Sequence, residues 1–103
     1  MRVYISGPMT GIPDLNRNIF QVCEELVRKA GHDPVNPHKL DHPDQDYFMC
    51  LRRDIKALMS CEMLIFLPGS HESRGANIEI RLASIVGIPV HDAEVFLKGV
   101  LNV

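Results

Sequence analysis

The chain has 103 residues, of which 46% are hydrophobic and 23% are charged. A chain of this length is expected to form a single domain, residues 1–103, and can bury roughly two thirds of the surface of its unfolded state. The formal net charge is -2, and eleven Lys and Arg residues are scattered among thirteen Asp and Glu residues. Because no basic stripe could follow a phosphate backbone, we do not expect duplex nucleic acid as a partner.

Three cysteines, Cys23, Cys50 and Cys61, lack the Cys-x-x-Cys spacing of redox and metal sites. The first two lie in helical apolar patterns, which predicts buried and reduced thiols. The first residues contain no apolar run of signal-peptide length, and the longest uninterrupted apolar run, residues 63–67, is too short to cross a bilayer. We therefore expect a cytoplasmic protein without a membrane partner.

The first half of the chain alternates short apolar runs with a helical pattern. Residues 3–5 form a β-rich run, and residues 19–30 place apolar side chains at helical spacing. Residues 33–37 have room for only a short strand, because prolines flank it and cannot donate to a ladder. Residues 38–46 are predicted to form a polar loop.

The second half repeats the alternation. A second helix is predicted over residues 48–59, followed by a buried central strand at residues 63–67. A third helix is predicted over residues 74–86, and residues 88–90 form a fourth short strand. The tail from residue 92 begins as a short helix.

This order of elements predicts an α/β domain with a doubly wound parallel sheet of four to five strands, Rossmann-like or flavodoxin-like. In such sheets ligands bind outside the carboxyl ends of the strands. The loops at residues 6–13 and 68–75 both lie at that edge, and each contains two glycines. The second loop runs into a helix N-terminus, which favours a small anionic ligand. Neither loop matches a Walker or dinucleotide fingerprint, so ordinary turns are the alternative.

Glu79 interrupts an otherwise apolar face of the third predicted helix. At helical spacing it shares a stripe with Ala76, Leu82, Ala83 and Val86. A carboxylate on a core-facing stripe is costly unless it is paired, hydrogen-bonded or protonated. A catalytic role would explain its presence, and the alternative is a Glu at the edge of the buried face with its tip in solvent.

Asp54 shares the apolar face of the second predicted helix with Leu51 and Leu58. If both helices dock near the central strand, Asp54 and Glu79 converge, and two carboxylates about 5 Å apart are what a retaining glycosidase needs. The alternative is an ion pair of Asp54 with Arg53 or Arg81 at the helix edge.

Three motifs together resemble the nucleoside 2-deoxyribosyltransferase superfamily. They are Tyr4-Ile-Ser-Gly-Pro-Met-Thr-Gly11, the Asp54 helix leading into Met63-Leu-Ile-Phe-Leu67, and Ser73-x-Gly75-Ala-x-x-Glu79. The resemblance covers about residues 1–91 and includes small members frequent in phages and prophages. It implies an N-glycosidase or deoxyribosyltransferase for nucleosides or nucleoside 5′-phosphates that uses no cofactor and no metal.

The resemblance also implies a role for each acid. Glu79 would be the nucleophile that forms a glycosyl-enzyme intermediate, Asp54 would assist proton transfer to the leaving base, and Tyr4 would contact the site near the nucleophile. These roles suit the chemistry, because a carboxylate stabilises oxocarbenium character at the sugar. Burial would keep Asp54 protonated, whereas hydrogen bonds from Tyr4 and backbone amides would hold Glu79 ionised.

Ser73 matches the position that selects the 5′ end of the substrate. The superfamily's nucleoside transferases usually have Asp there, whereas its 5′-phosphate hydrolases have Ser. The serine of this chain therefore favours a nucleotide as the ligand. Arg74 and Gly75 would complete the anion cradle. Thr10 stands where those hydrolases carry an arginine, so nucleoside and 5′-monophosphate both remain open. Other substrate-binding candidates come from the first loop: Ser6, Gly7, Met9, Thr10 and Gly11.

Several other residue patterns have simpler explanations. One stretch is rich in His and Asp, with His32, His38, Asp41, His42, Asp44 and Asp46. It would suit zinc if it were helical, but Pro37 and Pro43 disfavour a helix. We therefore predict a solvated loop in the position of a lid, and no metal. His71 is expected to be exposed. Four methionines, Met9, Met49, Met59 and Met63, are expected in the core or lining a pocket.

Two other functions fit the sequence. One is a phosphoribohydrolase with a Pro-Gly-Gly-x-Gly-Thr-x-x-Glu loop, which residues 68–75 resemble only in outline. The other is a non-catalytic module that binds or sequesters a nucleotide. Tyr4, Asp54 and Glu79 together favour an enzyme, because binding alone needs no two converging acids.

We also expect a homodimer. A sheet of this size leaves a shallow crevice, and burying most of a nucleotide needs walls on several sides. The superfamily resemblance implies the same, because an adjoining subunit commonly completes its active sites. The second helix, from Tyr47 to Met59, is the expected contact because Tyr47, Phe48, Met49 and Cys50 cover much of its circumference with apolar groups.

Overall fold

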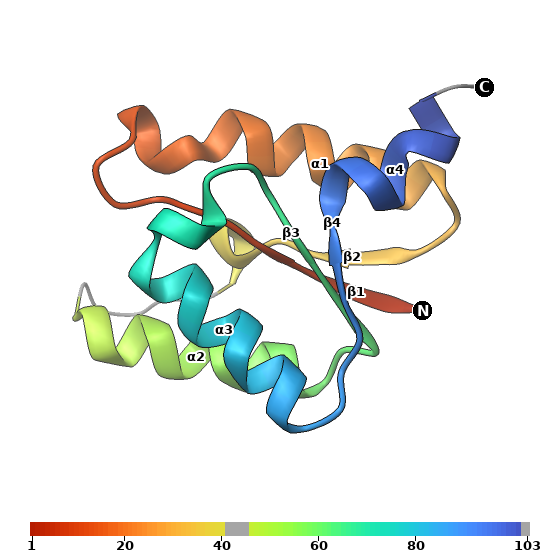
Figure 1. Ribbon diagram of the computed structural model, residues 1–103. Coiled ribbons are helices and arrows are strands. Elements are labelled where there is room, and N and C mark those ends of the chain that lie inside the picture. Colours follow the sequence, from red (N-terminus) through yellow and green to blue (C-terminus); the bar gives the residue numbers. More distant parts are fainter. Residues whose placement is uncertain (41–45, 102–103) are drawn as a thin grey trace.

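The computed structural model of the protein describes residues 1–40 and 46–101 (Figure 1). Within these residues, one parallel sheet contains β1 (Arg2–Ser6), β2 (Asp33–Val35), β3 (Met63–Phe66) and β4 (Val90–Asp92), in the order β2-β1-β3-β4. The predicted α/β class with a flavodoxin-like parallel sheet is confirmed, with four strands in the part of the chain described.

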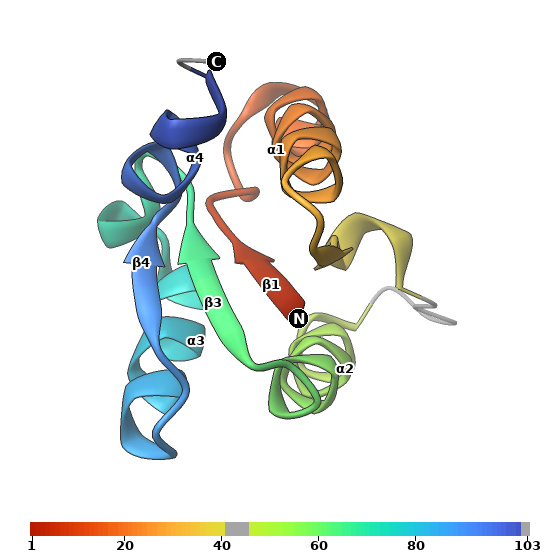
Figure 2. The same ribbon diagram turned by 90° about the vertical axis from the view of Figure 1, so that its right-hand side faces the viewer.

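The helices follow the strands as predicted. The α-helices are α1 (Arg17–Lys29), α2 (Tyr47–Met59), α3 (Arg74–Ile85) and α4 (Ala93–Leu101), and three short 3-10 helices, η1 (Pro13–Asn16), η2 (Pro37–Lys39) and η3 (Ser70–Glu72), lie in the loops. Helices α1 and α4 cover one face of the sheet, and α2 and α3 cover the other (Figure 2). Among the described residues, no helix is long and apolar enough to traverse a lipid bilayer.

Strand alternation divides the core into two clusters. Val3 and Ile5 of β1 pack with α1 and α4, whereas Tyr4 packs on the opposite face with Leu58 and Ala83. Because successive side chains of a strand point to opposite faces, Tyr4 and Ser6 both point toward α2 and α3. Two hydroxyls of β1 are thereby aimed at the layer that carries the predicted acids.

The fourth strand begins two residues later than predicted. Residues 88–90 were expected to pair, but the ladder with β3 starts at Val90 and runs to Asp92. Pro89 has no amide proton to donate, so it contributes only its carbonyl, which accepts from the Leu64 amide at 2.9 Å. Asp92 ends the strand because its carboxylate accepts from the amide of Glu94 at 2.8 Å in the first turn of α4.

Three apolar side chains predicted to be buried are exposed. Val86 follows the end of α3 and is 53% exposed, so it does not belong to the stripe of Glu79. Met49 and Met59 are also exposed, because they lie away from the side of α2 that carries Leu51 and Leu58 and faces the sheet.

Candidate active site

Glu79 lies in the interior, between α3 and the sheet. Its side chain is 5% exposed, so its tip is not in solvent. The Tyr4 hydroxyl donates to Glu79 Oε2 at 2.8 Å, and the Ser6 hydroxyl donates to Oε1 at 2.8 Å. Each carboxylate oxygen therefore has a hydroxyl donor from β1, which fixes the orientation of the group.

Burial dominates the electrostatics of this group. Desolvation and, to a smaller extent, the negative charge of Asp54 raise the pKa of Glu79 to about 7, against the lowering effect of the hydrogen bonds from Ser6 and Tyr4. Tyr4 donates to Glu79 as expected, but the second donor is the Ser6 hydroxyl where backbone amides were expected, and burial outweighs both hydrogen bonds in setting the pKa. Burial, together with the charge of Glu79, also holds the pKa of Tyr4 well above its usual value, so Tyr4 is a stable donor.

A cleft of about 590 Å³ opens beside Glu79 at the carboxyl ends of β1 and β3. Its walls come from the loop after β1, from α2, and from η3 with the start of α3. The lining residues are Gly7, Met9, Thr10, Leu15, Tyr47, Cys50, Leu51, Asp54, Glu72, Ser73, Arg74, Gly75, Ala76 and Glu79. The structure thus brings together most of the site residues predicted from the sequence.

Asp54 reaches the same cleft from α2. It is half-buried, and its negative charge is close enough to raise the pKa of both Glu79 and Tyr4. The full burial that was expected to keep Asp54 protonated is not present. The two acids nevertheless differ in surroundings, since Glu79 is enclosed and Asp54 is partly open to water.

The N-terminus of α3 forms one end of the cleft. Ser73 caps the helix by accepting from the Ala76 amide at 3.3 Å, and the Arg74 guanidinium lies 6.0 Å from the centre of the Tyr47 ring. The free amides of a first helical turn attract anions, so this end of the cleft suits an anionic group.

The first-loop candidates have unequal roles. Met9 and Thr10 line the cleft, but Ser6 lies behind it and contacts Glu79 instead of the cavity. Gly7 lines the cleft, yet packing explains its lack of a side chain, since a Cβ would lie 2.8 Å from Leu67 Cδ1. Gly11 is exposed in a turn with φ of 82°, outside the cleft lining.

Several cleft residues were not assigned to the ligand site from the sequence. Tyr47, Cys50 and Leu51 lie at helical spacing with Asp54. They could have been predicted by following the face of α2 that carries Asp54 toward the N-terminus of the helix. Cys50 is half-buried, unlike Cys23 and Cys61, and none of these three described cysteines forms a disulfide. Tyr47 lines the cleft, although it was predicted only as a subunit contact.

The His- and Asp-rich stretch is only partly described. Residues 41–45, including His42, lie outside the described residues. In the described part of the stretch, His38 has a ring nitrogen 2.9 Å from the Leu15 carbonyl. Asp46 caps α2 by accepting from the amides of Phe48 and Met49. Across residues 1–40 and 46–101, no three His, Cys, Asp or Glu side chains are grouped to hold a metal ion. His71 is exposed, as predicted.

The fold is that of nucleoside 2-deoxyribosyltransferases. The chain superposes on a 2-deoxyribosyltransferase from Bacillus psychrosaccharolyticus with a TM-score of 0.70 and 16% identity, covering 87% of this chain and 69% of that chain. For a 2-deoxyribosyltransferase from Leishmania mexicana the TM-score is 0.69 and the identity 18%, with 86% and 61% covered. For a CMP N-glycosidase from Clostridium botulinum the TM-score is 0.61 and the identity 21%, with 87% and 66% covered.

The family model named Domain of unknown function (DUF4406) matches residues 1–92, and the chain belongs to this family. No curated protein matches the sequence. The chain covers 61% to 69% of the length of the three solved structures above.

Proposed function

We propose that this protein breaks the N-glycosidic bond of a deoxynucleoside or its 5′-monophosphate through a covalent glycosyl-Glu79 intermediate. The observation that carries the proposal is the buried Glu79 carboxylate, held by the hydroxyls of Tyr4 and Ser6 at the inner end of a cleft that Asp54 also lines. A purely structural carboxylate would not need to face a cavity of this size.

In the first step a Glu79 oxygen bonds to the anomeric carbon and the bond from that carbon to the base nitrogen breaks. The electron pair of the broken bond stays on the base, which takes a proton from Asp54. In the second step water or another nucleobase attacks the anomeric carbon and gives its proton to the Asp54 carboxylate, while the bond from that carbon to Glu79 breaks and releases the Glu79 carboxylate. Hydrolysis and transfer therefore share the same intermediate. Tyr4 and Ser6 hold the carboxylate in place between the steps.

The fold comparisons support this reaction class. The superposed proteins are named as 2-deoxyribosyltransferases and a CMP N-glycosidase, and both names denote cleavage of an N-glycosidic bond. The proposal is tested by liquid chromatography of nucleobases released from a panel of nucleosides and 5′-monophosphates. Binding of panel members without release of any base would identify the protein as a nucleotide-binding module.

Replacing Asp54 with asparagine is expected to slow the release of poor leaving groups by about 10²-fold or more, because a general acid contributes most when the departing base needs a proton. Release of nitrophenol from a nitrophenyl deoxyriboside should fall by much less, since nitrophenolate leaves without protonation. Equal slowing of both reactions would assign Asp54 a structural role.

Replacing Ser73 with aspartate is expected to weaken the binding of 5′-monophosphates by about tenfold or more, because it places an anion beside the phosphate. Nucleoside binding should change little. Aspartate and asparagine are both good helix caps, so Ser73→Asn is the matched neutral control that preserves α3. Titration calorimetry that shows equal loss for both ligands would refute the assignment of Ser73 to the 5′ end.

We expect the protein to be a homodimer through α2. Tyr47, Phe48 and Met49 are exposed in its first turn, and Phe48 is 60% exposed at a position next to the cleft residue Tyr47. Light scattering at micromolar concentration should give twice the chain mass of 11.6 kDa. Phe48→Glu should give the monomer, whereas Val95→Glu, on the exposed surface of α4, should not. A native protein of monomer mass would contradict this assembly.

A further inference from the structure

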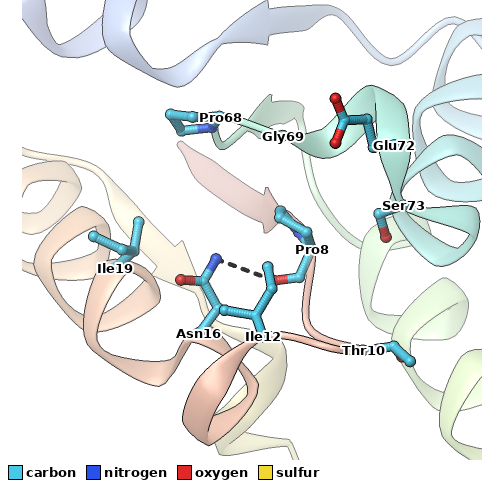
Figure 3. Close-up of a pocket in the computed structure, with 9 residues that line it drawn as sticks. All are labelled: Pro8, Thr10, Ile12, Asn16, Ile19, Pro68, Gly69, Glu72 and Ser73. Carbon is cyan, nitrogen blue, oxygen red and sulfur yellow. Dashed lines mark hydrogen bonds between the residues drawn. The ribbon is translucent and has the colours of Figure 1, made fainter.

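A second cavity of about 420 Å³ lies next to the cleft, between the loops that follow β1 and β3 (Figure 3). We call it the side cavity, and its far walls are formed by Pro8, Asn16, Ile19 and Pro68. Thr10, Glu72 and Ser73 line both the side cavity and the cleft. The two cavities therefore meet at the end of the cleft assigned to the 5′ end of the ligand.

The walls of the side cavity suit a flat and uncharged group. Two proline rings, Pro8 and Pro68, and the side chains of Ile12 and Ile19 provide apolar surface on several sides. Among the described residues that line it there is no Lys, Arg or His. A free phosphate would find no countercharge there, whereas the ring of a nucleobase would bury its apolar faces.

The side cavity contains hydrogen-bond acceptor groups on Asn16 and Glu72. One N–H of the Asn16 amide donates to the Pro8 carbonyl at 3.0 Å, and Asn16 Oδ1 is an acceptor (Figure 3). The Glu72 carboxylate has no hydrogen bond or ion pair from another described side chain. Acceptors of this kind match the exocyclic amino group of adenine, cytosine or guanine.

The backbone that carries Asn16 is strained. Asp14, Leu15 and Asn16 have φ of 52°, 52° and 63°, a left-handed conformation that is unfavourable for residues other than glycine. The His38 ring nitrogen, 2.9 Å from the Leu15 carbonyl, holds the turn in place. Leu15 faces the cleft and Asn16 faces the side cavity, so the strain is concentrated in the wall between the two spaces.

The charge at the junction favours a phosphodiester. Thr10 and Ser73 offer hydroxyls there and Glu72 adds a negative charge, whereas Arg74 lines the cleft and not the side cavity. A phosphomonoester carries nearly two negative charges at neutral pH, whereas a diester carries one and is repelled less.

We propose that the side cavity binds the base of a second nucleoside, joined by a phosphodiester to the 5′ oxygen of the nucleoside that is cleaved. The preferred ligand is then a dinucleotide, and its second base carries an exocyclic amino group. This inference rests on the proposed function, because that function places the 5′ end of the ligand at Ser73.

Calorimetry on the Glu79→Gln protein tests the inference without turnover. The probes are d(ApA), d(CpC), d(GpG) and d(TpT), each compared with its own 5′-monophosphate. For the three bases with amino groups, the dinucleotide should bind about tenfold more tightly than the monophosphate. The gain for d(TpT) should be smaller, because thymine lacks an exocyclic amino group.

A matched pair of substitutions assigns the gain to the side cavity. Ile19→Trp should fill this space and remove the gain while monophosphate binding stays unchanged, since Ile19 does not line the cleft. Val22→Trp is the control on the same helix, because Val22 is 46% exposed against 43% for Ile19 and lines neither cavity.

Equal binding of dinucleotide and monophosphate, or a gain that survives Ile19→Trp, would overturn the inference. Dinucleotide binding without base release by the native protein would instead overturn the proposed function alone.

Discussion

Glu79→Gln is expected to reduce base release by at least about 10³-fold while the fold is kept. Glutamine has nearly the same shape and can still accept a hydrogen bond from Tyr4 or Ser6, but its neutral amide is a poor nucleophile for the anomeric carbon. The rate is measured by chromatography of the free base, with circular dichroism as the check on folding.

The control for this experiment is Glu94→Gln, which changes the same chemical group at an exposed position of α4. That variant should release base at the native rate. If Glu79→Gln retained the native rate, Glu79 could not be the nucleophile, and the proposed mechanism would be wrong.

The same substitution is expected to stabilise the protein at alkaline pH. In the folded protein burial raises the pKa of Glu79 from 4.5 to about 7, so the folded state binds this proton more tightly than the unfolded state. As pH rises above 4.5 the unfolded chain loses the proton first, and the free energy of unfolding falls until the folded pKa is passed. The penalty at pH 8 is about 3 kcal/mol, and glutamine does not incur it.

Urea unfolding at pH 5 and pH 8 measures this effect. The stability of Glu79→Gln relative to the native protein should increase by about 2 to 3 kcal/mol between the two pH values, since most of the titration lies between them. Comparing the two pH values cancels any change in packing that glutamine itself introduces. Glu94→Gln should show no such increase. A difference that does not vary with pH would mean that Glu79 is not desolvated as the structure implies.

The sequence predicted the layers of the fold because its local patterns agree with its tertiary structure. The five apolar residues at 63–67 fit only a buried strand, and the neighbouring helical patterns each have one apolar face. Pro89 shows the limit of this reasoning, since apolar composition suggested a strand at a position where the missing amide delays pairing to Val90.

The acids of the site could be predicted because they break the apolar pattern of their helices. Glu79 and Asp54 are conspicuous for that reason, and both line the cleft. The contact from Ser6 to Glu79 could not be read from either segment, because it depends on how α3 docks against β1 across 73 residues of sequence. Ser6 was therefore expected to bind substrate, although in the structure it holds the carboxylate.

The side cavity had no sequence signal. Apart from Ile19 of α1, its walls come from two loops that are far apart in the chain, and loops lack the periodicity that reveals helices and strands. The left-handed turn at residues 14–16 contains no glycine, so local sequence preference would not place Leu15 there. Tertiary contacts, such as that from His38, override this preference.

Mass spectrometry of a trapped intermediate tests the central claim most directly. The native protein would be incubated with deoxynucleoside 5′-monophosphates that carry fluorine on the 2′ carbon, which withdraws electrons from the anomeric carbon and slows breakdown of the glycosyl ester. We expect the protein to gain the mass of the sugar phosphate without the base, and the adduct to map to the peptide that contains Glu79. Glu79→Gln should gain no mass. Base release without any adduct, or an adduct on a different residue, would contradict this claim.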